Sequence, residues 1–451
     1  MFQRFSDEGL AQNSYVIACD RTRKAAVIDP RRDIDVFVQT AERYELQIVH
    51  AIETHTHADF VSGARALAAV GAQVVAGPGA DLEFPFHEAR HGETIALGDI
   101  ALEILHTPGH TPEHISIVVR EPEQPARVLT GDTLFVGAVG RPDLLGDDQA
   151  GPLADALFDA LFQTLLALDD TVEVHPGHGA GSLCGAGIGH APHSTIGQER
   201  NFNPLLQKRN RAEFVTAVLA DLPDTPPYFP RMKRLNRVGP PLLETSAIPA
   251  LSAPAAAELV DRGALVIDLR SAEAFGIGHP RGALNIAFGP RVGYWAGWVV
   301  PEGARIVLLA SDLSQAQEAR LQLQRVGFDD VAGYIDQGYA AWRNAALASS
   351  SVELITAREL RDRIARRQQQ TIVDVRTPGE WQTGHVDLAI NIPVSELEDR
   401  AAELRKGSVV ATICESGFRS SLAASILLRA GGIDVVNVAD GTTAYRQLEP
   451  A

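Results

Sequence analysis

Two histidines and an aspartate alternate along one short segment, and this alternation constrains the fold more than any other feature of the chain. His55, His57 and Asp59 follow directly on the apolar run Gln47–Ile52, which predicts a buried strand. Side chains converge on one metal ion only where a rigid framework aims them, and the ends of strands provide such a framework. The pattern therefore predicts a metal site at the rim of a β-sheet.

Three further candidate ligands follow in separate short motifs. They are His110 in a Thr-Pro-Gly-His turn, Asp132 in a Thr-Gly-Asp-Thr turn after an apolar run, and His178 in a Pro-Gly-His-Gly turn. The combined spacing favours His55, His110 and Asp132 as metal ligands over a purely structural role. Two histidines and one carboxylate suit Fe(II) with O2, whereas Zn²⁺ with these ligands and a water would indicate a hydrolase. The motifs themselves leave both metals open.

Taken in order, the four motifs resemble the metal-binding motifs of the metallo-β-lactamase superfamily. In most of that superfamily the first motif reads His-x-His-x-Asp-His, and Phe60 stands at its last position in this chain. The replaced histidine holds a second metal ion in those proteins, so the resemblance implies one ion per chain. It also implies an α/β fold, an αββα sandwich, for an N-terminal domain that we place at residues 1–240.

The segments Gly137–Leu144 and Ser194–Pro204 resemble the corresponding segments of persulfide dioxygenases. This closer resemblance covers residues 1–240 and implies one Fe(II) per chain. The residues that match the iron ligands of that family are His55, His110 and Asp132.

Other residues near the metal motifs receive expected secondary roles. In persulfide dioxygenases, the residues that correspond to His57, Asp59 and His178 lie close to the iron without being required as ligands. Arg141 is expected to bind an acidic thiol substrate, because a guanidinium suits a carboxylate, and an ordinary salt bridge is the alternative. Cys184 lies in a glycine-rich stretch that resembles fused dioxygenase–rhodanese proteins, so it is either an accessory thiol or an inert one.

The C-terminal half of the chain contains an internal repeat. Its two units, 250–347 and 352–451, each alternate apolar strands with helical stretches, which predicts a parallel α/β sheet. Both units resemble rhodanese domains. Proline and serine favour linkers at 238–249 and 346–351. The clearest matches between the units are Asp268–Ser271 with Asp374–Thr377, Phe275 with Trp381, and Ala283–Ile286 with Ala389–Ile392.

The two units differ in the loop where rhodanese domains carry their reactive cysteine. In the second unit the strand Val409–Ile413 runs into Cys414, and the loop reaches Arg419 as a helix begins. Backbone N–H groups and a helix N-terminus around the sulfur favour its thiolate and a bound persulfide or anion, and Arg419 is expected to favour anionic sulfur species. The Cys-x4-Arg spacing is that of sulfurtransferases; cysteine phosphatases need one residue more. The first unit has Ala310–Ser314 here without a thiol, which predicts a structural or docking copy.

Composition excludes several classes of function. The formal net charge of −17 argues against a nucleic-acid partner, which needs a basic surface. The N-terminus lacks the apolar stretch of a signal peptide and no run could span a bilayer, so we expect a cytoplasmic protein without a membrane partner. Three cysteines in an odd number argue against a disulfide framework.

Together these patterns predict a three-domain enzyme. Its first site would oxidise the persulfide of glutathione or another low-molecular-weight thiol with O2 to sulfite. Its second site would transfer sulfane sulfur at Cys414, with thiosulfate as one product, and the sequence leaves a homo-oligomer open. One alternative is a zinc-dependent thioester hydrolase similar to glyoxalase II, which Phe60 disfavours. Another is a sulfur-relay or persulfide-sensing protein, which the complete metal set and the Cys414 loop disfavour.

Overall fold

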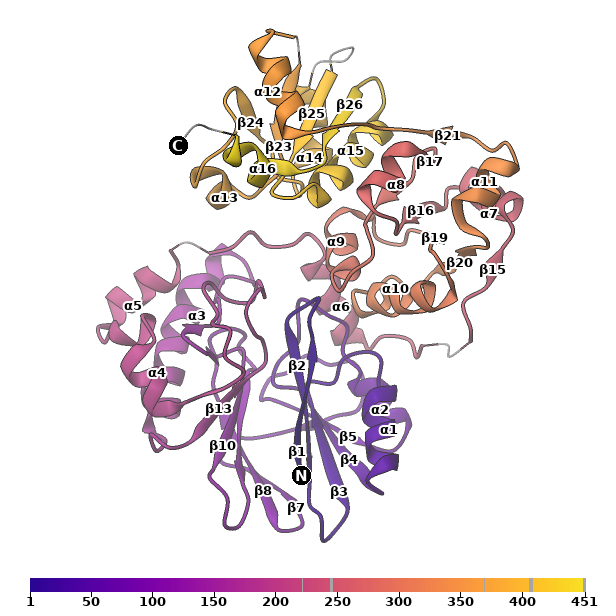
Figure 1. The fold of residues 1–451 in the computed structure, drawn as a ribbon. Helices are drawn as coiled ribbons and strands as arrows, with labels where there is room; N and C mark the ends of the chain where they lie inside the picture. Colours follow the sequence, from indigo (N-terminus) through magenta and orange to yellow (C-terminus); the bar gives the residue numbers. More distant parts are fainter. Residues whose placement is uncertain (221, 244–245, 369, 405–408, 449–451) are drawn as a thin grey trace. The chain divides into compact units, whose positions relative to one another are not determined.

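The computed structural model describes residues 1–220, 222–243, 246–368, 370–404 and 409–448. The chain forms two compact units, the first comprising Met1–Glu244 and Gln324–Gly327 and the second comprising Thr245–Leu323 and Phe328–Ala451 (Figure 1). Parts of three expected segments lie outside the described residues. These parts are residue 221 of the first expected domain, 244–245 of the first expected linker, and 369, 405–408 and 449–451 of the third expected domain.

The first unit is built on two six-stranded sheets. One sheet has the order β1 (Phe2–Asp7), β2 (Gln12–Ala18), β3 (Lys24–Ile28), β4 (Gln47–Ile52), β5 (Gln73–Ala76) and β6 (His87–Glu88). The other has the order β14 (Ser194–Thr195), β13 (Glu173–Pro176), β10 (Arg127–Gly131), β9 (Ile115–Arg120), β8 (Ile100–His106) and β7 (Thr94–Leu97). A short hairpin of β11 (Leu134–Phe135) and β12 (Ala138–Val139) lies next to the candidate ligand Asp132 in the sequence.

Alternation along the strands separates three hydrophobic cores. On β2, Tyr15 and Ile17 join the core between the two sheets, whereas Val16 and Ala18 face an outer core with helices. Successive strand residues point to opposite faces, so a strand buried on both faces must be apolar throughout. The outer core of the first sheet is closed by α1 (Asp35–Arg43) and α2 (Ala64–Ala69).

The outer face of the second sheet is covered by a further set of helices, and Figure 1 shows helices on both outer faces. This arrangement confirms the expected αββα sandwich. The elements that follow the second sheet's strands are α3 (Asp147–Asp159), η1 (Ala160–Thr164), η2 (Leu165–Ala167), α4 (Ile196–Phe202), η3 (Leu205–Gln207), α5 (Arg211–Val218) and α6 (Phe229–Val238).

The second unit contains two parallel five-stranded sheets with the same strand order, as the repeat predicts. One runs β15 (Ala250–Leu251), β20 (Val331–Ile335), β19 (Ile306–Leu309), β16 (Leu265–Asp268) and β18 (Leu284–Asn285). The other runs β22 (Glu353–Ile355), β26 (Asp434–Val438), β25 (Val409–Ile413), β23 (Thr371–Asp374) and β24 (Ala389–Asn391).

Helices connect the parallel strands of both sheets. In the first repeat they are α7 (Ala253–Asp261), α8 (Ala272–Ile277), α9 (Val292–Val299), α10 (Leu313–Arg325) and α11 (Gly338–Asn344). In the second they are α12 (Ala357–Ala365), α13 (Pro378–Gln382), α14 (Leu397–Arg400), η4 (Ala401–Glu403), α15 (Phe418–Ala430) and α16 (Gly441–Gln447). No helix among the described residues combines the length and hydrophobicity that crossing a membrane requires.

The second expected linker, 346–351, is not wholly irregular. Its residues Ser349–Ser350 form β21, which pairs antiparallel with β17 (His279–Pro280) of the first repeat. The serines satisfy backbone hydrogen bonds of a neighbouring segment, so this part of the chain is a paired strand and not a free connection.

The two repeats share a polar frame at the ends of β16 and β23. Arg270 binds Asp268 through both carboxylate oxygens, at 2.9 and 2.5 Å, and donates to the Gly278 carbonyl at 2.8 Å. In the second repeat Arg376 makes the same contacts with Asp374 and Gly384. Bidentate arginine–carboxylate pairs fix geometry as well as adding energy. The frame is completed by Asn285 and Asn391, and by the ring stacks of Phe275 on His279 and Trp381 on His385.

Candidate functional site

His55, His110 and Asp132 lie together in the first unit, just beyond strand ends or in a turn between strands. The Nε2 atoms of His55 and His110 lie 3.8 and 3.6 Å from Oδ2 of Asp132. Both Nε2 atoms are buried and have no hydrogen-bond partner among the described residues. A buried nitrogen without a partner is costly, and a cation bound between the three side chains would remove that cost. The structure therefore brings the three expected ligands into an arrangement that fits one metal ion.

The electrostatics of this cluster suit metal binding. Burial, together with the nearby His57, lowers the pKa of His55 well below its ordinary value, and burial also lowers the pKa of His110. Burial alone would raise the pKa of Asp132, but His178 beside it holds that pKa well below the usual range. The cluster thus offers two neutral imidazoles and one carboxylate ion, the protonation states that ligate metals.

Hydrogen bonds on the far side of each ligand fix its orientation. The Nδ1–H of His110 donates to the Arg141 carbonyl at 2.8 Å, and Nδ1 of His55 lies 2.9 Å from the Thr54 hydroxyl. The backbone N–H of Asp132 donates to Nε2 of His114 at 2.9 Å. Burial lowers the pKa of His114 to about 3, so its ring stays neutral and can accept. Such supporting contacts aim the ligand atoms inward. The role of His114 was not predicted from the sequence.

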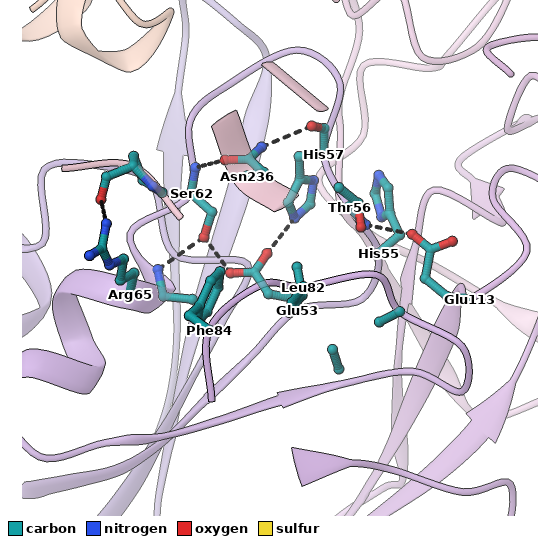
Figure 2. A pocket seen from close by; sticks show the side chains of 14 residues that line it. Glu53, His55, Thr56, His57, Ser62, Arg65, Leu82, Phe84, Glu113 and Asn236 are labelled. Atoms are coloured by element: carbon teal, nitrogen blue, oxygen red, sulfur yellow. Dashed lines mark hydrogen bonds and ion pairs between the residues drawn. The ribbon is translucent and has the colours of Figure 1, made fainter. Parts of the chain in front are cut away.

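His57 turns away from this cluster. Its Nε2 lies 3.1 Å from both Asp29 and Glu53, and Figure 2 shows the ring directed at the Glu53 carboxylate. Burial would lower the pKa of His57, but the two carboxylates raise it to about 10. The Phe60 ring packs against it with 4.3 Å between ring centroids. His57 is therefore held between two buried carboxyl groups.

A narrow pocket with a cavity volume of about 20 Å³ lies beside the cluster. His55 and His57 line it together with Glu53, Glu113 and Phe84 (Figure 2). Its walls combine apolar side chains with a few polar groups, as small-molecule sites do. The pocket therefore leaves space for only about one or two water-sized groups next to one of the candidate ligands.

Asp59 and His178, the other expected neighbours of the ligands, form a chain with Asp132. Nδ1 of His178 lies 2.8 Å from Oδ1 of Asp132, and its Nε2 lies 2.8 Å from Oδ2 of Asp59. Burial would lower the pKa of His178, but Asp132 and the groups around it raise that pKa well above its ordinary value. His178 thereby holds the Asp132 carboxylate in place beside His55 and His110.

Arg141 does not lie open to a substrate in this structure. Its guanidinium is buried and binds both carboxylate oxygens of Asp143, at 2.7 and 2.6 Å. It also donates to the Leu183 carbonyl and the Thr225 hydroxyl. The observed contacts therefore give Arg141 the role of a salt-bridge partner. The salt bridge helps to position the Arg141 backbone carbonyl, which accepts a hydrogen bond from His110. Substrate binding by Arg141 stays a prediction.

The Cys414 loop forms a cradle at the end of β25. The Gly417 N–H donates to Sγ of Cys414 at 3.2 Å, Ser420 Oγ lies 3.5 Å from the sulfur, and the Thr442 N–H donates to the Cys414 carbonyl at 2.8 Å. Because α15 begins at Phe418, the sulfur lies beside a helix N-terminus, which favours negative charge.

Arg419, expected to attract anionic sulfur species, forms a two-bond ion pair with Glu380, with both bonds at 2.6 Å. Burial would raise the pKa of Glu380, but Arg419 lowers it to about 2. The pair therefore remains ionised at neutral pH. Arg419 is held in the first turn of α15 with its charge balanced, and its role toward a substrate stays a prediction.

Gly417 offers a test of the loop geometry. Its φ is 93°, and a methyl group there would lie 2.0 Å from the Ala439 carbonyl oxygen. We expect Gly417→Ala to cost about 1–3 kcal/mol through backbone strain and to abolish sulfur transfer from thiosulfate to cyanide. Gly379→Ala in α13 is the matched control, since no described atom lies within 4 Å of its added methyl. Equal activity and equal urea stability in both variants would contradict the cradle.

Both halves of the chain match known families. Residues 7–178 match the metallo-beta-lactamase superfamily, and 252–345 and 356–448 each match the rhodanese-like domain. A metallo-beta-lactamase from Staphylococcus aureus is similar over 74% of this chain and 98% of its own, with 35% identity and a TM-score of 0.67. Hydroxyacylglutathione hydrolase GloC from Haemophilus influenzae is 28% identical over 44% of this chain and 95% of its own. ETHE1 from Myxococcus xanthus is 29% identical, covering 52% of this chain and 98% of its own, with a TM-score of 0.46.

Proposed function

Because the chain belongs to the metallo-β-lactamase superfamily and continues into two rhodanese-like domains, we propose that it is an iron-dependent persulfide dioxygenase with a sulfur-transferring cysteine. One observation carries the proposal. The chain combines a buried cluster of His55, His110 and Asp132, whose histidine Nε2 atoms have no hydrogen-bond partner among the described residues, with a cysteine loop that has the Cys-x4-Arg spacing of sulfurtransferases. Phe60, packed on His57, occupies the place of the histidine that would serve a second ion in a two-metal hydrolase.

His55, His110 and Asp132 would hold one Fe(II). An ion held by two histidines and a carboxylate keeps open coordination positions and supplies O2 chemistry. Overall, the outer sulfur of the persulfide gains both atoms of O2 and one oxygen from water, its S–S bond breaks, and the thiol leaves with a proton. The sulfur gives up four electrons, which O2 accepts, so no other reductant is required.

The protein's own groups orient and shield this reaction. The three ligands are at most 2% exposed, which excludes bulk water from the cluster. His178 and the His114 ring keep the Asp132 carboxylate fixed through separate hydrogen bonds. Preorganisation of this kind saves the cost of ordering these groups during the reaction.

At the second site Cys414 would carry sulfane sulfur. Its thiolate attacks the outer sulfur of a persulfide or thiosulfate, the S–S bond breaks, and the thiol or sulfite leaves. The cysteine persulfide can then give that sulfur to sulfite, which forms thiosulfate and returns the thiolate. The Gly417 N–H and the start of α15 stabilise the anionic sulfur in both states. The first repeat has Ala310 and Ser311 in place of the thiol, so we assign it a structural role.

Thioester hydrolysis is the second candidate function, because GloC, a hydroxyacylglutathione hydrolase, is similar over the metal domain. Elemental analysis of the purified full chain, combined with an oxygen electrode, separates the two. We expect about one iron per chain and O2 consumption only when glutathione persulfide or another thiol persulfide is added. S-lactoylglutathione should not be hydrolysed. Two zinc ions per chain together with thioester hydrolysis would overturn the proposal.

A further inference from the structure

Arg419 and Glu380 form an ion pair beside the Cys414 loop, and the sulfur transfer described above gives this pair no role. Arg419 lies in the first turn of α15, and both of its bonds to the Glu380 carboxylate measure 2.6 Å. The Arg419 side chain is 18% exposed and that of Glu380 is 37% exposed, so solvent reaches both groups. Glu380 also accepts from the Thr377 N–H at the start of α13, at 3.0 Å. The pair therefore joins the reactive loop to a neighbouring helix at a position that a ligand can approach.

The fold of a repeat does not need this pair, because the first repeat has other residues at both positions. The matches between the repeats place Ala274 at the position of Glu380 and Gln315 at the position of Arg419. The helix α8 still begins with a side-chain cap, since the hydroxyl of Ser271 accepts from the Ala274 N–H at 3.3 Å, and α13 begins with the equivalent threonine. The pair thus occurs in the repeat that carries the reactive cysteine, which indicates a role in its chemistry.

The charged side chains around the Cys414 loop balance one another. Three arginines and three carboxylates are joined by ion pairs of 2.6 to 3.4 Å, namely Arg376 with Asp374 and Glu415, Arg446 with Glu415, and Arg419 with Glu380. Glu415 is also held by the hydroxyls of Thr442 and Thr443, at 3.0 and 2.7 Å. Each arginine of the group is therefore paired. The attraction that remains for an anion comes from the Gly417 N–H and the N-terminus of α15.

The two kinds of sulfur donor for this site differ in charge. Thiosulfate is a dianion, and its reaction with the Cys414 thiolate moves the outer sulfur to Cys414, breaks the S–S bond and releases sulfite. A thiol persulfide carries one negative charge on the reacting sulfur, and the same step releases a thiolate. Coulomb energy scales with ligand charge, so an unpaired guanidinium beside Cys414 would favour thiosulfate. Burial would lower the pKa of Arg419, but Glu380 and then the nearby Cys414 sulfur raise it, so this guanidinium is close enough to act on the site.

We propose that Glu380 is a positioning residue that sets the choice of sulfur donor: it neutralises Arg419, so that Cys414 takes its sulfur from thiol persulfides in preference to thiosulfate. The inference rests on the proposed role of Cys414 as a sulfur carrier and adds the selectivity of that site. Glu380 acts through Arg419 and touches no substrate itself. The half-buried rings of Phe418 and Trp295, whose centroids lie 6.0 Å apart, offer apolar surface for the organic part of a persulfide. Both sites of the chain would then draw on the same donor.

Glu380→Gln in the full chain tests the inference. Glutamine also completes a capping box, so α13 keeps its cap while the charge is removed. Transfer to cyanide is measured as thiocyanate, with either thiosulfate or glutathione persulfide as the donor, and the rate of Cys414→Ser is subtracted as background. We expect kcat/KM with thiosulfate to rise about tenfold through a lower KM, and kcat/KM with glutathione persulfide to rise about threefold or less. Added salt should reduce the gain with thiosulfate.

Two further variants separate the charge of Arg419 from other effects. Glu380→Gln combined with Arg419→Gln should return the ratio of the two donor constants to that of the unaltered protein, because no guanidinium is left to attract the dianion. Glu359→Gln is the matched control, since it removes a carboxylate that pairs with Arg363 in α12 at 2.8 Å. It should change neither donor constant.

Three outcomes would overturn the inference while leaving Cys414 as the sulfur carrier. They are a preference of the unaltered protein for thiosulfate, an unchanged donor ratio in Glu380→Gln, and a gain with thiosulfate that persists in the double variant. If neither donor gives thiocyanate above the background of Cys414→Ser, the proposed sulfur transfer fails, and the inference fails with it.

Discussion

Asp132→Ala is expected to empty the metal site and lower persulfide-dependent O2 consumption by a factor on the order of a hundred or more. Asp132 is the only charged ligand of the His55, His110 and Asp132 cluster, and it also anchors His178. Its loss leaves two neutral imidazoles, which hold Fe(II) weakly. Sulfur transfer from thiosulfate to cyanide should stay within about twofold of the unaltered protein, because the Cys414 loop belongs to a separately folded unit.

Iron content and O2 uptake are measured on the same preparations of Asp132→Ala. Asp99→Ala is the control, since it removes an exposed carboxylate that pairs with Arg21. It should change neither quantity. Iron bound at one per chain in Asp132→Ala, or simultaneous loss of sulfur transfer in a protein with an unaltered circular dichroism spectrum, would contradict the two-site assignment.

Cys414→Ser should produce the opposite pattern. A serine hydroxyl replaces the thiolate without filling more space, so the fold stays intact, but the residue can no longer accept sulfur. We expect the rate of sulfur transfer to cyanide to fall by a factor on the order of 10³ or more, with O2 uptake unchanged. The full chain is used throughout, with Cys19→Ser as the control.

Residual transfer in Cys414→Ser would also report on the first repeat. That repeat carries no thiol in its equivalent loop, so the remaining rate should equal the uncatalysed background. A rate well above background would show that another group in the chain carries sulfur and that the structural role assigned to the first repeat is wrong.

Long, strongly patterned elements were predictable from the sequence. The expected strands Gln47–Ile52 and Val409–Ile413 have the same bounds in the structure. Both are apolar runs that end at turn residues. The helix after Cys414 was expected as the loop reaches Arg419, and it begins at Phe418, directly after Gly417 with its positive φ.

Contacts set by tertiary packing were not predictable in this way. Ser349 and Ser350 form a two-residue strand, which is too short to show an alternating hydrophobic pattern in the sequence. A linker was therefore predicted from the sequence at this position. The hydrogen bond from the Asp132 N–H to the His114 ring was also not predictable, because no sequence motif indicates the role of an isolated histidine. The pairing of Arg141 with Asp143 lies within two positions on the chain, but its burial depends on segments far along the sequence.

The polar frame of the rhodanese-like repeats makes folding and chemistry separable. The Asp268–Arg270 and Asp374–Arg376 pairs lie at the ends of β16 and β23, whereas the reactive loop follows β25. A duplicated copy could therefore lose its thiol during evolution without losing the interactions that fold it. The same independence makes the first repeat a ready scaffold for engineering, into which a Cys-x4-Arg loop could be grafted after Leu309 to give one chain two sulfur carriers.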